Sequence, residues 1–572
     1  MAGESRKWMI LVATIWIQAF TGTNFDFSAY SSTMKKVLGI TQVQLNYLAV
    51  ASDLGKAFGW SSGLASKCLP LWLVLFISAF MGLFGYGLQW LLLRNVIALP
   101  YFVVFLLCLL SGCSICWFNT VCFILCNRNF PSNRPLAISL TVSFNGVSAA
   151  LYALAATAID PSSSSSSTPL LYLLLNSLIP LITSLFALLP ILRQPPLSPL
   201  PLDSILVRRD SFIFLLLNLI AILTGLYLLL LPSSASSTNS SRLLFTGALF
   251  LLILPLFIPG IIYARNWFRR AIHSHIQRSS GFLLVDVEDL ELHKELISRE
   301  TNSLPSGNPS TDVEEEKRGG VISNRVSSTW EGFLGKDSIV MLGEEHDIGM
   351  LLRRLDFWLY FWAYFCGGTI GLVYSNSLGQ IAQSLGLGPQ TSTLITLYSS
   401  FSFFGRLLSA APDFMRVKVY FARTGWLAVA LVPTPIALFM LAASGSARAL
   451  HAGTALIGLS SGFIFAAAVS VTSELFGPNS VGVNHNILIT NIPMGSLVYG
   501  LLASLIYDAN AAPTRGMMTE TVVCMGRQCY FLTFVGWGCV SVVGLASSVV
   551  LFLRTRPAYD RYEKNRSSTQ LY

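Results

Sequence analysis

The stretch LWLVLFISAFMGLFGYGLQWLLL, residues 71–93, holds 23 consecutive residues without a charged side chain. A helix needs about 20 apolar residues to cross the roughly 30 Å of hydrocarbon in a bilayer. Thirteen more apolar runs of similar length flank this stretch, so that eight runs precede one long acidic segment and six follow it. The pattern predicts an all-α integral membrane protein with about 14 transmembrane helices. The runs begin near Trp8, Leu45, Leu71, Ile97, Leu136, Leu170, Phe212, Leu243, Leu355, Thr391, Val419, Leu450, Asn484 and Tyr530.

The composition of the chain agrees with a membrane protein. Of its 572 residues, 53% are hydrophobic and only 11% are charged, whereas soluble domains carry about 25% charged residues. The net charge of +9 comes from basic residues scattered over short loops, which argues against a nucleic-acid partner. The sequence contains no phosphate-binding loop, metal-ligand cluster or assembled nucleophile–base pair. We therefore expect neither an enzyme nor a bound cofactor or metal.

The distribution of Lys and Arg among the loops predicts the orientation of the chain. If the amino terminus is cytosolic, the loops on that side carry more than twice as many basic residues as the opposite loops. Such a bias places the basic loops in the cytosol. We therefore expect both termini in the cytosol, together with an acidic, largely disordered loop at 265–354 and a tail at 555–572. The choice between the plasma membrane and the vacuole or another internal membrane stays open.

The order of the runs suggests a carrier architecture. Six runs, two runs, the acidic loop and six runs fit two six-helix bundles of the major facilitator type, with an inserted helix pair. The bundles would span 1–192 and 355–554, and the inserted pair 193–264. The inserted pair contains few polar residues, so we expect it to be peripheral and to face lipid.

A weak internal repeat supports two related halves. Gly63 to Lys67 ends the second run, and Gly405 to Ser409 ends the second run after the acidic loop. Each segment combines glycine with a basic residue, which suits closely packed helices that are latched by ion pairs. We predict a cytosolic gate built from Lys67, Gly405, Arg406, Asp413 and Arg416.

Several short motifs together resemble a known family. They are Gly22–Ser31, Ser52–Gly59, Asn129–Arg134, Ser143–Gly146, Asn376–Leu385, Gly405-Arg406, Ser473–Phe476 and Tyr507-Asp508. The combination resembles the plant nodulin-like family, including its nuclear-fusion-defective type, which belongs to the major facilitator superfamily and is distantly similar to monocarboxylate and oxalate carriers. The resemblance implies a carrier fold, but the substrates of this family are mostly unassigned. Many relatives carry a Lys where this chain has Thr141–Asn145, so no substrate role of that Lys can be transferred.

Ionisable residues inside the apolar runs are the first candidates for transport. Burying one costs roughly 2.5–3.5 kcal/mol on insertion scales, so such residues usually face a cavity and a partner. Four lie within the runs: Asp26, Asp53, Lys56 and Arg406. Asp53 and Lys56 are three residues apart on one helix face and can pair directly. Two interpretations remain open: a pair that only fixes helix packing, or a pair that exchanges partners with a proton or an anionic substrate.

Polar residues in other runs complete the expected lining of a transport pathway, although each alone also suits an interhelical hydrogen bond. They are Gln18, Asn24, Asn119, Asn145, Tyr364, Tyr374, Asn376, Gln380 and Asn491. We expect His485 to lie at a solvated helix start near the cytosol. Cys524 and Cys529 flank Gly526 in an external loop, where oxidation to a disulfide is possible.

These features favour a secondary active transporter of a small polar solute, with an organic anion and proton coupling as the specific hypotheses. The expected partners are the lipid bilayer, a small-molecule substrate and protons, with no nucleic acid. The alternative is a carrier-fold protein that no longer transports and acts as a receptor or membrane-organising factor through its cytosolic loop. The sequence identifies neither the substrate nor the direction of transport.

Overall fold

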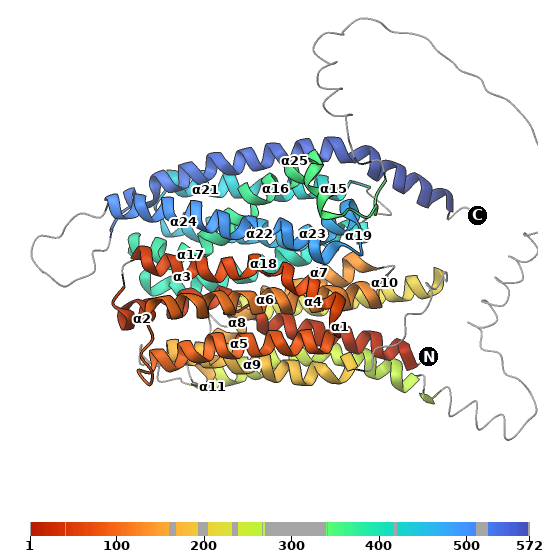
Figure 1. Ribbon diagram of the computed structural model, residues 1–572, viewed down its shortest axis with the longest axis horizontal. Coiled ribbons are helices and arrows are strands. Elements are labelled where there is room, and N and C mark those ends of the chain that lie inside the picture. The colour runs from red at the N-terminus through yellow and green to blue at the C-terminus, as the bar shows by residue number, and fades with distance from the viewer. Residues whose placement is uncertain are drawn as a thin grey trace, which may run out of the picture.

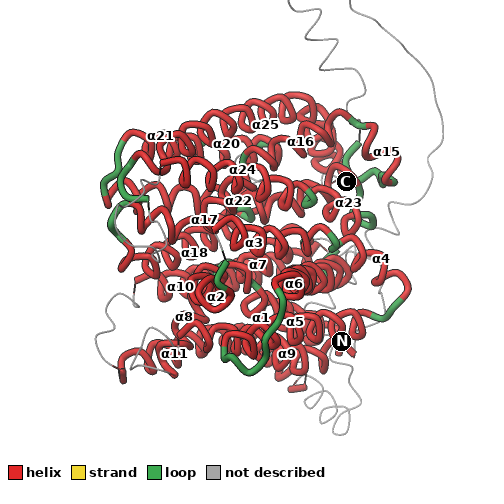
Figure 2. Tube along the Cα trace, turned by 60° about the vertical axis from the view of Figure 1, so that its left-hand side comes forward, coloured by secondary structure: helices red, strands yellow, loops and turns green. Residues whose placement is uncertain are grey.

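The computed structural model describes residues 2–40, 42–131, 133–159, 168–192, 204–230, 238–265, 267–268, 339, 341–415, 420–510 and 524–569. Within these ranges all regular structure is helical (Figures 1 and 2). The long helices run side by side, and both termini lie at the same end of the bundle (Figure 1). We call this end the termini end.

The described residues of the amino-terminal half form nine α-helices and one 3₁₀ turn. They are α1 (Ala2–Thr21), η1 (Thr23–Asp26), α2 (Phe27–Leu38), α3 (Gln42–Ala57), α4 (Trp60–Cys68), α5 (Leu71–Leu93), α6 (Tyr101–Asn129), α7 (Arg134–Asn145), α8 (Ser148–Ile159) and α9 (Thr168–Leu192). The inserted pair follows as α10 (Ser204–Leu230) and α11 (Thr238–Ile253), and after the 3₁₀ turn η3 (Leu254–Leu256) the chain is helical again at 257–265.

The carboxy-terminal half follows the acidic loop. Its elements are α15 (Ile348–Arg353), α16 (Leu355–Cys366), α17 (Gly368–Ser384), η4 (Gly388–Gln390), α18 (Thr391–Leu408), α19 (Ala411–Met415), α20 (Arg423–Leu431), α21 (Pro433–Ala443), α22 (Ala447–Phe476), α23 (Val481–Leu488), α24 (Asn491–Asn510) and α25 (Gln528–Thr569).

Eleven helical segments among the described residues are long and apolar enough to cross a membrane. This number is smaller than the 14 transmembrane helices expected from the sequence. The three remaining runs coincide with α1–α2, α3–α4 and α16–α17, where the helix is interrupted or carries polar and charged residues. Gly22, Gly59 and Gly367 lie at these breaks. A Cβ on Gly22 would lie only 2.5 Å from the carbonyl oxygen of Asn145, so the break lets two helices approach closely.

The two halves meet along two seams. In the first seam α3 packs on α24 and α4 on α23, and in the second α7 and α8 pack on α18. Hydrogen bonds cross both seams: Asn46 donates to Ser504 in the first, and Ser399 donates to the carbonyl oxygen of Gly146 in the second. Any cavity between the seams is therefore shared by the two halves.

The inserted helix α10 is less peripheral than the sequence suggests. One face of it is exposed, with Phe212 63% accessible, but the opposite face is buried. Lys7 of α1 forms an ion pair with Asp210 of α10, with 2.6 Å between Nζ and Oδ2. A Cβ on Gly225 would lie 2.5 Å from the ring of Phe403 in α18. The expectation of a purely lipid-facing pair is therefore wrong for α10, which contacts both halves at the second seam.

Two further observations concern the expected loop and tail. Most of the acidic loop, 269–338, lies outside the described residues, and the disorder expected from the sequence concerns this part of the chain. Its described end contacts the carboxy-terminal half, where Glu345 accepts hydrogen bonds from the backbone N–H groups of Asn479 and Ser480. The expected tail is helical as far as Thr569, because α25 continues beyond the buried ion pair of Arg554 with Asp356.

Candidate functional site

Two cavities lie between the halves of the protein. The Asp53 cavity has a volume of about 50 Å³, and the Arg406 cavity has a volume of about 110 Å³. The polar residues on the wall of the Asp53 cavity are Ser31, Asn46, Tyr47, Asp53, Asn376, Ser377, Gln380 and Ser496. Those on the wall of the Arg406 cavity are Gln18, Lys56, Asn119, Asn145, Tyr364, Arg406 and His485. Along α3, which runs toward the termini end, Asn46 and Asp53 precede Lys56, so the Arg406 cavity is the one nearer that end.

The ion pair of Asp53 and Lys56 lies between these cavities. The distance from Lys56 Nζ to Asp53 Oδ1 is 2.5 Å, and both side chains are buried. Asp53 contributes to one cavity wall and Lys56 to the other. The second carboxylate oxygen, Oδ2, accepts a hydrogen bond from Ser496 of α24. The pair therefore separates the cavities and is tied to the opposite half across the first seam.

Arg406 is a buried residue of the cavity wall. Its Nη1 donates to Asn145 Oδ1 at 3.4 Å, and its guanidinium lies 5.7 Å from the ring centre of Phe465. Asn145 belongs to the amino-terminal half and Arg406 to the carboxy-terminal half, so this contact joins the halves beside the second seam. An arginine in this position supplies positive charge and fixed N–H donors to a ligand in the cavity.

Among the described residues of the predicted gate, Asp413 forms an ion pair with a residue outside the predicted set. Asp413 pairs with Arg423 at 2.7 Å, and Arg423 also pairs with Glu474 at 2.9 Å. A turn follows α18, so α19 carries Asp413 away from the inward-facing Arg406. Lys67 is exposed at the end of α4, and Arg416 lies outside the described residues.

Reciprocal glycines bring α3 against α6 and α18 against α22. A Cβ added to any of these four glycines would lie between 1.8 and 2.1 Å from a carbonyl oxygen of the partner helix. Each residue of the α3–α6 contacts has a counterpart 350 residues later in the α18–α22 contacts. Lys56 directly follows Gly55, and Arg406 directly follows Gly405. The internal repeat therefore aligns Lys56 with Arg406, and not Gly63–Lys67 with Gly405–Ser409 as expected from the sequence. The contacts are Gly55 with Leu109, Gly112 with Ser52, Gly405 with Leu459 and Gly462 with Ser402.

His485 is a cavity residue that the sequence reasoning placed in solvent. Its side chain is only 8% accessible, and its ring lies 6.0 Å from that of Phe123 in an edge-on contact. The short helix α23 packs on α4, and Asn486 Nδ2 donates to the carbonyl oxygen of Gly59 at 3.0 Å. This docking turns the start of the transmembrane segment inward. The polar run at 484–486 within an apolar stretch is the sequence signal that could have indicated the inward position of His485.

Two other candidates lie away from both cavity walls. Asn491 stabilises the break between α16 and α17, because it accepts from Thr369 at 3.3 Å and donates to the carbonyl oxygen of Phe361 at 3.5 Å. Asp26 is buried at the end of η1 near the amide of Asn176, and its Oδ2 atom makes no hydrogen bond within the described part of the chain. A third candidate, Tyr374, also lines neither cavity, and its hydroxyl forms a hydrogen bond with that of Thr454. Of the others, Asn376 and Gln380 line the first cavity, and Gln18, Asn119, Asn145 and Tyr364 line the second.

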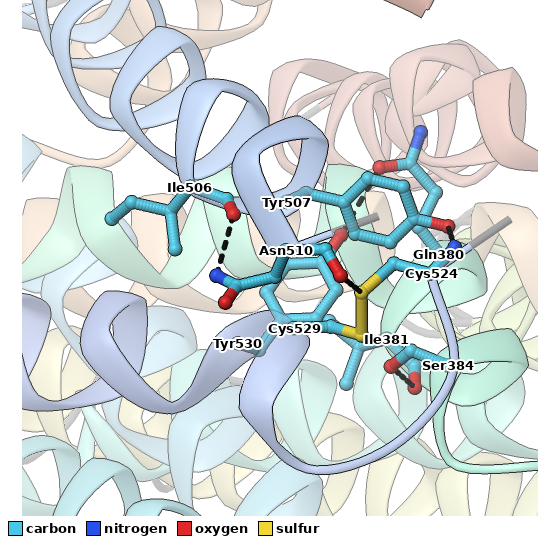
Figure 3. The surroundings of a disulfide bond; sticks show 9 residues. All are labelled: Gln380, Ile381, Ser384, Ile506, Tyr507, Asn510, Cys524, Cys529 and Tyr530. Atoms are coloured by element: carbon cyan, nitrogen blue, oxygen red, sulfur yellow. Dashed lines mark hydrogen bonds between the residues drawn. A yellow bond between two sulfur atoms is a disulfide. The ribbon is translucent and has the colours of Figure 1, made fainter. Parts of the chain in front are cut away.

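The loop before α25 is closed by a disulfide between Cys524 and Cys529 (Figure 3). The N–H of Cys524 donates to the hydroxyl of Tyr507 at 3.0 Å, and the hydroxyl of Tyr530 donates to Gln380 at 3.2 Å. These contacts hold the ends of α17, α24 and α25 together at the end opposite the termini. Because Gln380 also lines the Asp53 cavity, the loop supports one wall of that cavity.

A helical bundle with two related halves, interrupted helices and cavities between the halves has the architecture of the major facilitator fold. Solved structures share this fold. The proton:xylose symporter XylE from E. coli has a TM-score of 0.50 and 12% identity, over 96% of this chain and 95% of that chain. The PepTSo2 structure has a TM-score of 0.51 and 10% identity, over 98% of this chain and 100% of that chain. At these identities the likeness concerns the fold alone.

Sequence comparisons define the family more closely. The Nodulin-like model matches residues 7–260, and the model of the NFD4 C-terminal domain matches residues 340–560. Protein NUCLEAR FUSION DEFECTIVE 4 from Arabidopsis thaliana is 57% identical over 571 residues, covering 99% of this chain and 92% of that protein. The probable transporter MCH1 from Yarrowia lipolytica is 28% identical over 206 residues, covering 34% of this chain and 41% of that protein. The chain belongs to the nodulin-like, NFD4-type family and has the multi-pass helical fold of the major facilitator structures.

Proposed function

We propose that this protein is a secondary active transporter of a small organic anion, coupled to protons, that works by alternating access between its two halves. The observation that carries the proposal is the charge of the Arg406 cavity. Lys56 from one half and Arg406 from the other lie on its wall, and none of the described residues on that wall is an Asp or Glu. A buried cation is costly unless an anion or hydrogen bonds compensate it. An anionic substrate would add its charge to the contacts that the two cations already make.

The surroundings of the two cations suit exchangeable binding. Lys56 pairs with Asp53, and the contacts of Arg406 include the neutral amide of Asn145 and the ring of Phe465. A carboxylate of the substrate can accept two parallel N–H bonds from a guanidinium, which is a strong and directional contact. The volume of about 110 Å³ suits an ion of a few carbon atoms.

Asp53 provides a physical basis for proton coupling. If the substrate anion takes over Lys56, Asp53 loses its cationic partner and binds a proton more readily. The neutral acid would no longer hold Lys56, and its contact with Ser496 would change. Since Ser496 belongs to the opposite half, protonation of Asp53 would be linked to the packing of α3 on α24.

The same proposal includes the orientation and the moving units. Both termini and the acidic loop would face the cytosol, and the disulfide loop would face the cell exterior or the lumen of an organelle. Disulfides persist in such oxidising compartments. The halves 1–192 and 355–554 would rock against each other along the two seams, with the pair 193–264 at the second seam.

The test is uptake of labelled organic anions into proteoliposomes that contain the full-length protein, driven by an imposed pH gradient. We expect at least one small anion to accumulate, and the Arg406→Gln variant to lose that uptake. Arg448→Gln is the matched control, because Arg448 is exposed at the start of α22. Uptake by Arg406→Gln equal to that of the wild type would contradict the proposed site.

A further inference from the structure

Among the neutral side chains on the wall of the Arg406 cavity, two polar atoms are buried without a hydrogen-bond partner within the described residues: Nδ2 of Asn145 and Nδ1 of His485. The side chains are 9% and 8% accessible, respectively. Most buried polar atoms in proteins are hydrogen-bonded, so each exception needs an explanation. Here the two exceptions come from different halves and border the same cavity.

The orientation of the Asn145 amide is fixed by its other contact. Its Oδ1 accepts from Arg406, so its Nδ2 must donate elsewhere. Elsewhere on the same wall, Gln18 Nε2 donates to Asn119 Oδ1 at 2.8 Å. Among the neutral side chains of the wall, the unsatisfied atoms therefore belong to Asn145 and His485.

We propose that the substrate carries a hydroxyl or carbonyl group beside its anionic group, and that Asn145 and His485 recognise this neutral group. This inference rests on the proposed function, because it names the class of anion for the same cavity: a small hydroxy or oxo acid. A hydroxyl oxygen can accept from Asn145 Nδ2 while its hydrogen is donated to an unprotonated His485 Nδ1. A carbonyl oxygen can accept from both nitrogens if the His tautomer carries its proton on Nδ1. His485 is then a specificity-determining residue, and Arg406 holds the charge.

The experiment compares acids that differ by one hydroxyl. The thermal unfolding midpoint of the purified full-length protein is measured against lactate and propionate, and against malate and succinate, since a ligand that binds only the folded protein raises the midpoint. In at least one pair, we expect the hydroxylated acid to reach half of its maximal shift at a concentration about tenfold lower than its partner. His485→Phe keeps an aromatic ring against Phe123 and should reduce this ratio to about one, whereas His485→Asn should retain part of it.

His451→Phe is the matched control, because the ring of His451 bonds the carbonyl oxygen of Ala447 in its own helix and does not line either cavity. Its ratio should equal that of the wild type. Equal affinity of the wild type for both acids of each pair would overturn the inference and leave the anion site standing, as would an unchanged ratio in a folded His485→Phe protein. If His485→Phe does not fold, the wild-type ratio and His485→Asn decide. The absence of any shift with every acid, together with pH-driven anion uptake that Arg406→Gln leaves intact, would instead refute the proposed function.

Discussion

Neutralising one member of the Asp53–Lys56 pair should damage folding more than neutralising both. In Lys56→Gln, the carboxylate of Asp53 stays buried and keeps only its contact with Ser496. Breaking a buried ion pair in this way typically costs about 3–5 kcal/mol, because one charge is left uncompensated. The double variant Asp53→Asn, Lys56→Gln removes both charges and should recover most of that loss.

The assay has two readings: the yield of monodisperse protein with its thermal midpoint, and pH-dependent uptake in proteoliposomes. We expect a low yield from each single variant, near wild-type yield from the double variant, and loss of proton coupling in the double variant. The exposed pair Arg556 and Asp560, with 3.6 Å between Nε and Oδ2, serves as the control, because neutralising it should change neither reading. A double variant that is fully active with unchanged pH dependence would refute the coupling role. A Lys56→Gln protein as stable as the wild type would refute the burial argument itself.

Three further predictions concern packing and topology. Gly405→Ala should destabilise the protein by about 1–3 kcal/mol or more, because the new Cβ would lie 2.1 Å from a backbone carbonyl oxygen of α22. Gly379→Ala is the control and should be tolerated, because its Cβ would meet only a methyl group at 3.5 Å. Equal thermal midpoints of the two variants would contradict this prediction. A protease added to sealed right-side-out vesicles should spare the Glu314–Lys317 segment, and cleavage without permeabilisation would reverse the proposed orientation. Alkylation of denatured, non-reduced protein should leave Cys524 and Cys529 unlabelled, and two reactive thiols would disprove the disulfide.

Much of the architecture was predictable, because apolar runs of bilayer length have few alternatives to helices. The proximity of Asp53 and Lys56 was also predictable, since a spacing of three places both on one helix face. Interrupted helices were harder to count, because a break such as that at Gly367 shortens each segment below the length of a bilayer span. The count of spans therefore depends on how each break is treated.

The composition of the site depended on tertiary packing that local sequence does not encode. Whether Arg406 faces a cavity or the cytosolic surface is decided by the rotation of α18, which the close glycine contacts with α22 fix. His485 is buried because α23 docks on α4, a helix more than 400 positions earlier in the chain. The sequence does not indicate the role of α10 for a related reason: an apolar composition suits both lipid and a protein seam, and the contacts of α10 with Lys7 and Phe403 distinguish them.

The central claim is that anion binding at Lys56 and Arg406 is linked to protonation of Asp53. The most direct test imposes an anion gradient on proteoliposomes that start without a pH difference and follows the internal pH with a trapped dye. The account predicts that the anion gradient moves protons in the wild type, and that the double variant Asp53→Asn, Lys56→Gln transports little anion and moves no protons. Anion transport by the wild type without any change in internal pH would contradict it.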